Sequence, residues 1–154
     1  MAPDIDPAAL TPDELLLWRS LGRLVHALPR ALEEDMARTG VTMTEFAVLL
    51  LLSEAPDRRM RMSALAAAAG LTPSRITRVV DGLAHHGMVR KERHDNDRRG
   101  NHAVLTDTGL HAMRSAQATH LASARRRVLD HIPEHLVPDL AQALAGTTEA
   151  LYQP

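Results

Sequence analysis

Two arginines and two hydroxyl side chains are clustered in the segment 73–78, whose sequence is PSRITR. The guanidinium of an arginine can donate two parallel hydrogen bonds to O6 and N7 of a guanine, and a serine or threonine can bond to a phosphate or a base edge. At the start of a helix, such side chains can enter the major groove. The residue types therefore predict contact with DNA through Pro73, Ser74, Arg75, Thr77 and Arg78.

A second polar segment, 95–101 with the sequence DNDRRGN, contains no apolar residue. Arginines insert into the narrow, electronegative minor groove of DNA, above all over A·T tracts. Asp97 lies two residues before Arg99 and is suited to hold its guanidinium in place, and Gly100 permits a tight turn. The segment predicts minor-groove contact by Arg98 and Arg99, with Asp97 positioning Arg99.

The elements around these two segments indicate how their side chains are held. Ser63 can cap a short alanine-rich helix that ends at Gly70, and Thr72 can cap the next helix. Short strands at 88–93 and 102–105 enclose the second polar segment. The apolar stripe of the helix after Thr72 must face the core and consists of Ile76, Val79, Val80 and Leu83. The pattern predicts a helix-turn-helix followed by a β-hairpin wing.

Two helices are expected before this lobe. Thr11 and Glu14 form a capping box for the first helix, whose leucines recur at spacings of three and four. Pro29 falls inside it and should kink or split it. Thr42 and Glu45 form a second capping box, and the helix that follows is apolar nearly all round, so it should be central.

Two more helices are expected after the lobe. Thr106 caps the first of them, and the last opens at Pro133 unless Pro138 delays its start. The first and last helices of the chain carry more leucine than one small winged domain can cover, which predicts burial against a second copy. Two-fold pairing would place two recognition helices about 34–36 Å apart, one turn of DNA.

Charge is distributed unevenly along the chain. Residues 57–103 contain ten Arg or Lys against five Asp or Glu, and the rest contains eight against fourteen. A basic middle between acidic flanks favours an anionic partner for the middle. The longest purely apolar run, 46–52, is too short to span a membrane, and the first ten residues lack the features of a secretion signal. The expected location is cytoplasmic.

Catalytic and metal sites find little support. The chain has no cysteine and nine histidines, of which only His131 and His135 are four residues apart. Their segment, HIPEH, has the letters of a zinc-peptidase pattern, but Pro133 interrupts the helix that this pattern needs. The acidic run 33–35 is interpreted as an exposed patch. We therefore expect no enzyme, no metal and no cofactor.

The residues from Leu71 to Gly109 together resemble the MarR family of transcriptional regulators. The matching pieces, in order, are Pro73-Ser74, Thr77-Arg78, Asp81-x-Leu83, Gly87-x-Val89, Asp97-x-Arg99 and Leu105-Thr106-x-x-Gly109. The resemblance implies a mainly α fold with a small β-hairpin wing, in a single domain over 1–154. It implies dimerisation helices at 10–40 and 106–152 and a winged helix-turn-helix DNA-binding lobe at 42–105.

The resemblance also implies a function. It implies a homodimer that binds near-palindromic double-stranded DNA, usually as a repressor that a small ligand releases. Arg78 and its neighbours would read the major groove, and Arg99 would enter the minor groove. Trp18 and Phe46 would border a ligand cleft between the dimerisation helices and the lobe. The alternatives are a ligand-independent DNA-binding or architectural protein and, less favoured, a small enzyme.

Overall fold

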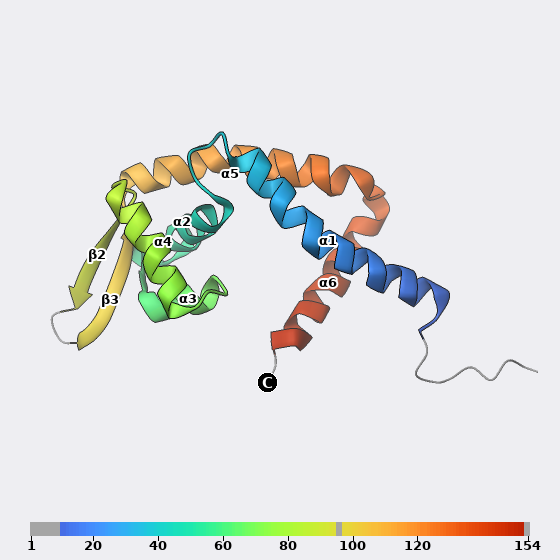
Figure 1. Cartoon of the computed structure of the whole chain (residues 1–154), viewed down its shortest axis with the longest axis horizontal. Helices are drawn as coiled ribbons and strands as arrows, with labels where there is room; N and C mark the ends of the chain where they lie inside the picture. Colours follow the sequence, from blue (N-terminus) through green and yellow to red (C-terminus); the bar gives the residue numbers. More distant parts are fainter. Residues whose placement is uncertain (1–9, 95–96, 153–154) are drawn as a thin grey trace, which may run out of the picture.

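The computed structural model describes the backbone of residues 10–94 and 97–152 and the side chains of residues 10–92 and 101–151 (Figure 1). The mainly helical fold with a small sheet is confirmed. The elements, in order, are α1 (Pro12–Met36), α2 (Met43–Glu54), η1 (Pro56–Arg58), β1 (Arg59–Arg61), α3 (Met62–Ala68), α4 (Pro73–His85), β2 (Val89–His94), β3 (Asp97–Leu105), α5 (Asp107–Arg127), η2 (Leu129–His131), η3 (Glu134–Leu136) and α6 (Val137–Tyr152).

The sheet is antiparallel with the strand order β1-β3-β2. Val89 of β2 pairs with Leu105 of β3, and Arg59 of β1 pairs with Val104 on the other side of β3. The hairpin expected from the sequence is therefore present, but β3 begins at Asp97, five residues before the expected start. β1 was not predicted from the sequence, because three residues are too few to show the alternation of apolar and polar side chains that marks a strand.

One core joins the helices of the lobe to its sheet. α2 lies at the centre of it, as its all-round apolar sequence predicts. Because the end of α1 and the first half of α5 also contribute buried side chains, the lobe and the long helices form one continuous core. The cluster consists of Met36, Val41, Phe46, Val48, Leu49, Leu52, Leu65, Ala66, Ile76, Val80, Leu83, Val89, Ala103, Leu105, Met113 and Ala116.

The helix-turn-helix is formed by α3 and α4. Gly70 takes a φ of +63° in the turn between them, a conformation that favours glycine. Thr72 caps α4 as expected, but the expectation that Ser63 caps α3 is wrong. α3 starts two residues earlier than a Ser63 cap would place it, at Met62. Arg61 is at the cap position with no side-chain cap bond, because it is extended as the last residue of β1.

α1 begins at the predicted capping box, in which the Oγ1 of Thr11 accepts from the backbone N–H of Glu14 at 3.3 Å. It continues through Pro29 as one helix, so of the expected kink or split, the split does not occur. Proline removes the N–H that would bond to the carbonyl of Val25. Both residues are exposed, so water can bond to that carbonyl instead.

α5 runs from the winged lobe at one end to the η2–η3 turn and α6 at the other, and α1 packs along it (Figure 1). α6 starts at Val137 rather than at Pro133, with Pro138 in its first turn. Within the described chain, its main contacts are with the adjoining η3. The leucines of α6 are exposed, up to 80% for Leu151.

Candidate nucleic-acid interface

The predicted major-groove residues all lie on the exposed face of α4. Ile76, Val80 and Leu83 on its opposite face are buried and fix the helix on the core. The Oγ1 of Thr72 accepts a hydrogen bond from the backbone N–H of Arg75 at 3.3 Å, so the Thr72 side chain caps the N-terminus of α4. The exposed residues are Pro73, Ser74, Arg75, Thr77 and Arg78.

The two hydroxyls of this face have partners that limit their chemistry. Thr77 Oγ1 donates to the carbonyl of Pro73 at 2.8 Å. A hydroxyl has one proton, so in this arrangement Thr77 can accept a hydrogen bond or present its methyl group, but it cannot donate to a phosphate. Ser74 Oγ lies 3.2 Å from Thr72 Oγ1. Of this group, the arginines are therefore the main donors.

Arg75 and Arg78 are unneutralised within the described part of the chain, where no carboxylate lies within ion-pair distance of either. Their neighbour Asp81, one turn further along α4, forms an ion pair with Lys91 of β2 instead. The face thus presents two guanidiniums that have no partner among these side chains. Such groups can bond to base edges or phosphates.

The wing is the hairpin of β2 and β3. The paired backbone reaches His94 and Asp97, with an irregularity between Arg93 and His94. The backbone of Asp97, Arg98 and Arg99 lies in β3. Their side chains, however, lie outside the part that the structure describes, so the pairing of Asp97 with Arg99 stays a prediction.

The base of the wing carries a small ion-pair network. Glu92 binds Arg90 of the same strand at 2.7 Å and Arg59 of β1 at 3.6 Å. The hydrogen bond from Arg90 lowers the pKa of Glu92, and the charges of Arg90 and Arg59 act in the same direction. The carboxylate is therefore ionised at neutral pH and neutralises part of the basic strand pair.

A tight junction joins the end of α4 to the start of α5. Thr106 Oγ1 donates to the carbonyl oxygens of Gly87 and Met88, at 2.7 and 2.9 Å, and accepts from the N–H of Gly109 at 3.0 Å. A Cβ built at Gly109 would lie 2.1 Å from the carbonyl oxygen of Met88. Only glycine fits there, so this residue fixes how closely α5 approaches the turn at Met88 that follows α4.

Asp35 corrects the interpretation of residues 33–35 as an exposed acidic patch. Its side chain is only 14% exposed and binds Arg126 at 2.8 Å and Arg127 at 3.0 Å. Ser123 Oγ also donates to this carboxylate. The hydrogen bond from Arg127, followed by that from Ser123, holds the pKa of Asp35 well below its usual range. The sequence interpretation missed this contact because its partners lie about ninety residues away, on α5.

The two aromatic residues predicted to border a ligand cleft lie in different environments. Phe46 is 2% exposed, and its ring centroid is 4.9 Å from that of His120 on α5. Trp18, in contrast, is 69% exposed on α1. Their role in a ligand cleft stays a prediction.

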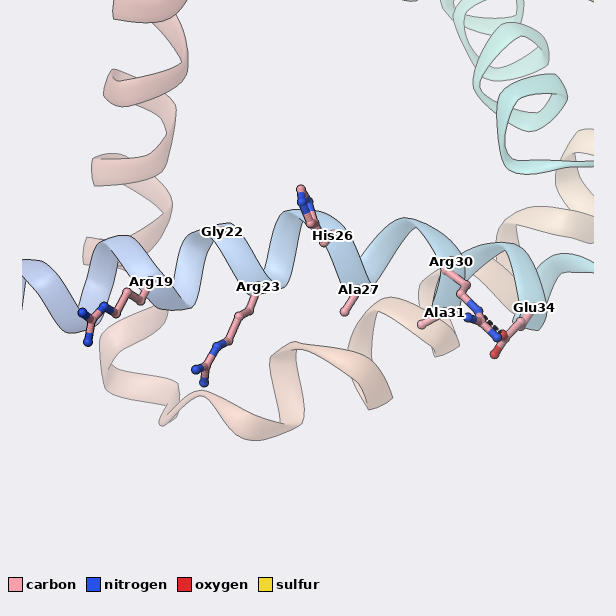
Figure 2. A pocket seen from close by; sticks show the side chains of 8 residues that line it. All are labelled: Arg19, Gly22, Arg23, His26, Ala27, Arg30, Ala31 and Glu34. Carbon is pink, nitrogen blue, oxygen red and sulfur yellow. Dashed lines mark hydrogen bonds and ion pairs between the residues drawn. The ribbon is translucent and has the colours of Figure 1, made fainter.

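A hollow of about 1120 Å³ lies instead along one face of α1 (Figure 2). Three arginines and a histidine line it, together with the small residues of the same face. One of these arginines, Arg30, is bound to Glu34 at 3.0 Å. The lining residues are Arg19, Gly22, Arg23, His26, Ala27, Arg30, Ala31 and Glu34.

The histidine pair has the geometry expected from Pro133. His131 ends η2 and His135 lies in η3, so no continuous helix brings their rings to one face. Among the side chains that the structure describes, no group of three metal-ligating residues converges. No helix within the described ranges is both long and apolar enough to cross a membrane.

Fold and surface together define a winged helix-turn-helix protein. The sequence model of the MarR family matches residues 41–100. The solved structure of AbsC, a MarR family transcriptional regulator from Streptomyces coelicolor, is 36% identical with a TM-score of 0.83, covering 93% of this chain and 97% of AbsC. That of Sco3205, a MarR family regulator from the same organism in complex with DNA, is 32% identical with a TM-score of 0.85, covering 97% of this chain and 94% of Sco3205.

Among curated proteins, the HTH-type transcriptional repressor YetL of Bacillus subtilis (strain 168) is 31% identical over 102 residues. That stretch is 66% of this chain and 61% of YetL, so the chain spans about three fifths of this relative. The chain belongs to the MarR family. The matched proteins are transcriptional regulators rather than enzymes, in agreement with the expectation from the sequence.

Proposed function

We propose that the protein is a homodimeric, sequence-specific repressor of transcription that acts in the cytoplasm on a near-palindromic operator. The observation that carries the proposal is the pair Arg75 and Arg78, exposed on α4 with no carboxylate partner among the described residues. Bidentate bonds from such arginines to guanine are the commonest specific contact in the major groove. YetL, which is named a repressor, and Sco3205, which was solved with DNA, support the same conclusion.

The dimer is proposed from the terminal helices. Leu17 and Trp18 of α1 and Leu144 and Leu151 of α6 are all more than half exposed. Within the part of the chain that the structure describes, helix α6 also has few contacts beyond the adjoining η3. Apolar area of this extent on a single copy marks an interaction surface. A second copy that presents the same leucines is the simplest occupant, and two-fold symmetry would supply the second recognition helix.

Release by a small ligand completes the proposal. The hollow on α1 supports it, because α1 packs against α5 and α5 leads directly to the recognition helix through Thr106 (Figures 1 and 2). Its arginines favour an anionic molecule. Trp18 and Phe46 remain the residues that the family resemblance proposes for such a cleft.

Selection of bound fragments from the genome of the source organism tests the function. The expected result is an enriched near-palindromic sequence beside a small set of genes. Arg78→Ala should bind that sequence less tightly by about 1–3 kcal/mol and relax the preference for it. Arg114→Ala, which removes an exposed arginine from α5, is the matched control and should bind as the unsubstituted protein does. Enrichment of no sequence, or equal binding by Arg78→Ala, would refute the proposal.

A further inference from the structure

An ion pair joins the recognition helix to the wing. Asp81 Oδ1 on α4 binds Nζ of Lys91, the third residue of β2. Within the described residues, no other ion pair links α4 to the sheet. Lys91 is also the only lysine of the chain, whose other seventeen basic residues are arginines. The side chains of Lys91 and Asp81 are 38% and 53% exposed, so neither is fixed by burial.

The position of Asp81 makes its partner important. It follows Arg78 by three residues and Thr77 by four, so it lies on the same face of α4 as the residues proposed to read bases. Side chains at these spacings on a helix are neighbours, and an arginine and an aspartate there attract each other. An Asp81 without Lys91 would therefore have Arg78 as its nearest cation on the helix. It would also place an uncompensated negative charge beside the DNA phosphates.

Lys91 is placed to prevent both effects. It approaches from β2, where Val89, two residues earlier and on the same face of the strand, packs into the core. Arg90 and Arg59 already form ion pairs with Glu92, which lies on the other face of β2. Among the side chains of β2 that the structure describes, Lys91 is therefore the cation left for Asp81.

We infer that Lys91 is a specificity-determining positioning residue. It holds the carboxylate of Asp81 away from Arg78 and neutralises it, which keeps the Arg78 guanidinium free for a base. This inference rests on the proposed DNA-binding function and adds a residue that touches no base. It differs from the simplest role for a lysine near DNA, which is a direct phosphate contact.

The test uses the full-length protein and its selected operator, with a random duplex of the same length as reference. Lys91→Met should weaken operator binding about fivefold, and binding to random DNA should fall less, because the loss acts through Arg78. Asp81→Asn should bind at least as tightly as the unsubstituted protein. The double variant Lys91→Met/Asp81→Asn should recover most of the loss, with an unchanged salt dependence. Lys91→Arg, which keeps the pair, should behave as the unsubstituted protein.

A phosphate contact by Lys91 predicts a different pattern. Both DNAs would lose affinity equally, the salt slope would fall by about one, and Asp81→Asn would give no rescue. That result would overturn the inference, and so would weaker binding by Asp81→Asn alone. Asp130→Asn is the matched control, because Asp130 is also ion-paired and 53% exposed but lies in η2. If the unsubstituted protein prefers no sequence, the proposed function fails together with the inference. If it prefers one sequence but the variants follow the phosphate-contact pattern, only the inference fails.

Discussion

Gly109→Ala tests how the recognition helix is joined to the long helices. In most helices this change is stabilising by about 0.5–1 kcal/mol, because glycine loses more backbone entropy on folding. Here the new Cβ would lie 2.1 Å from the carbonyl oxygen of Met88 and 2.9 Å from its carbonyl carbon. Backbone atoms cannot rotate out of the way as a side chain can. Because ordinary non-bonded contacts begin near 3.5 Å, α5 must move by about 1.4 Å.

The expected cost follows from that displacement. Overpacking of this kind costs about 1–3 kcal/mol and occasionally more. Moving α5 also lengthens the bonds from Thr106 Oγ1 to the carbonyls of Gly87 and Met88, each worth about 1 kcal/mol. After the gain in helix propensity is subtracted, the free energy of unfolding should fall by about 2–3 kcal/mol.

Urea unfolding followed by far-UV circular dichroism measures this change, at one fixed protein concentration because a dimer is more stable when concentrated. Gly82→Ala in α4 is the control, since its Cβ would meet only Glu45 Oε1, at an ordinary 3.9 Å. It should be neutral or stabilising by up to about 1 kcal/mol. If Gly109→Ala is as stable as Gly82→Ala, the proposed close approach at this junction is wrong.

Three further experiments test the wing, the buried carboxylate and the dimer separately. Asp97→Ala and Arg99→Ala should each weaken operator binding, and the double variant should lose clearly less than the sum because Asp97 acts through Arg99; tighter binding by Asp97→Ala in a titration would reject this wing mechanism. Asp35→Asn should lower the free energy of unfolding at neutral pH. Because the folded pKa of Asp35 is depressed, its contribution to the free energy of unfolding is present above the unfolded pKa of about 3.9 and is lost as the pH falls toward the lower folded value. If urea unfolding shows a deficit for Asp35→Asn that is as large at about pH 3 as at neutral pH, this explanation is wrong. Sedimentation at micromolar concentration should give twice the chain mass of 16.9 kDa, and a stable folded monomer would remove the basis for the dimer.

The features predicted correctly from the sequence are local ones. Thr11, Thr42, Thr72 and Thr106 all cap helices as expected, because a cap bonds to a backbone N–H three residues away. The outward face of α4 was also predictable, since its apolar stripe repeats within four turns. The amphipathic pattern therefore places Arg75 and Arg78 on the surface without any knowledge of the tertiary structure.

The features that were missed depend on distant partners. β1 is a strand only because β3 lies beside it. Asp35 is a mostly buried acceptor only because α5 brings Arg126 and Arg127 to it. Ser63 was assigned as a cap from its type, but α3 already begins at Met62, directly after β1 ends at Arg61. The pair of Asp81 and Lys91 had no signal in the sequence either, because ten residues and a change of direction separate them.

Methylation interference on the selected operator tests the central claim most directly. Methylation of guanine N7 blocks the major-groove edge that an arginine of α4 would bind. Two α4 helices related by two-fold symmetry should give two symmetric clusters of interfering guanines, whose centres lie about 10–10.5 base pairs apart or a multiple of that. Arg78→Ala should remove the interference at the same guanine in both clusters, whereas Arg114→Ala should leave it. A single cluster, or a pattern that Arg78→Ala does not change, would contradict the account.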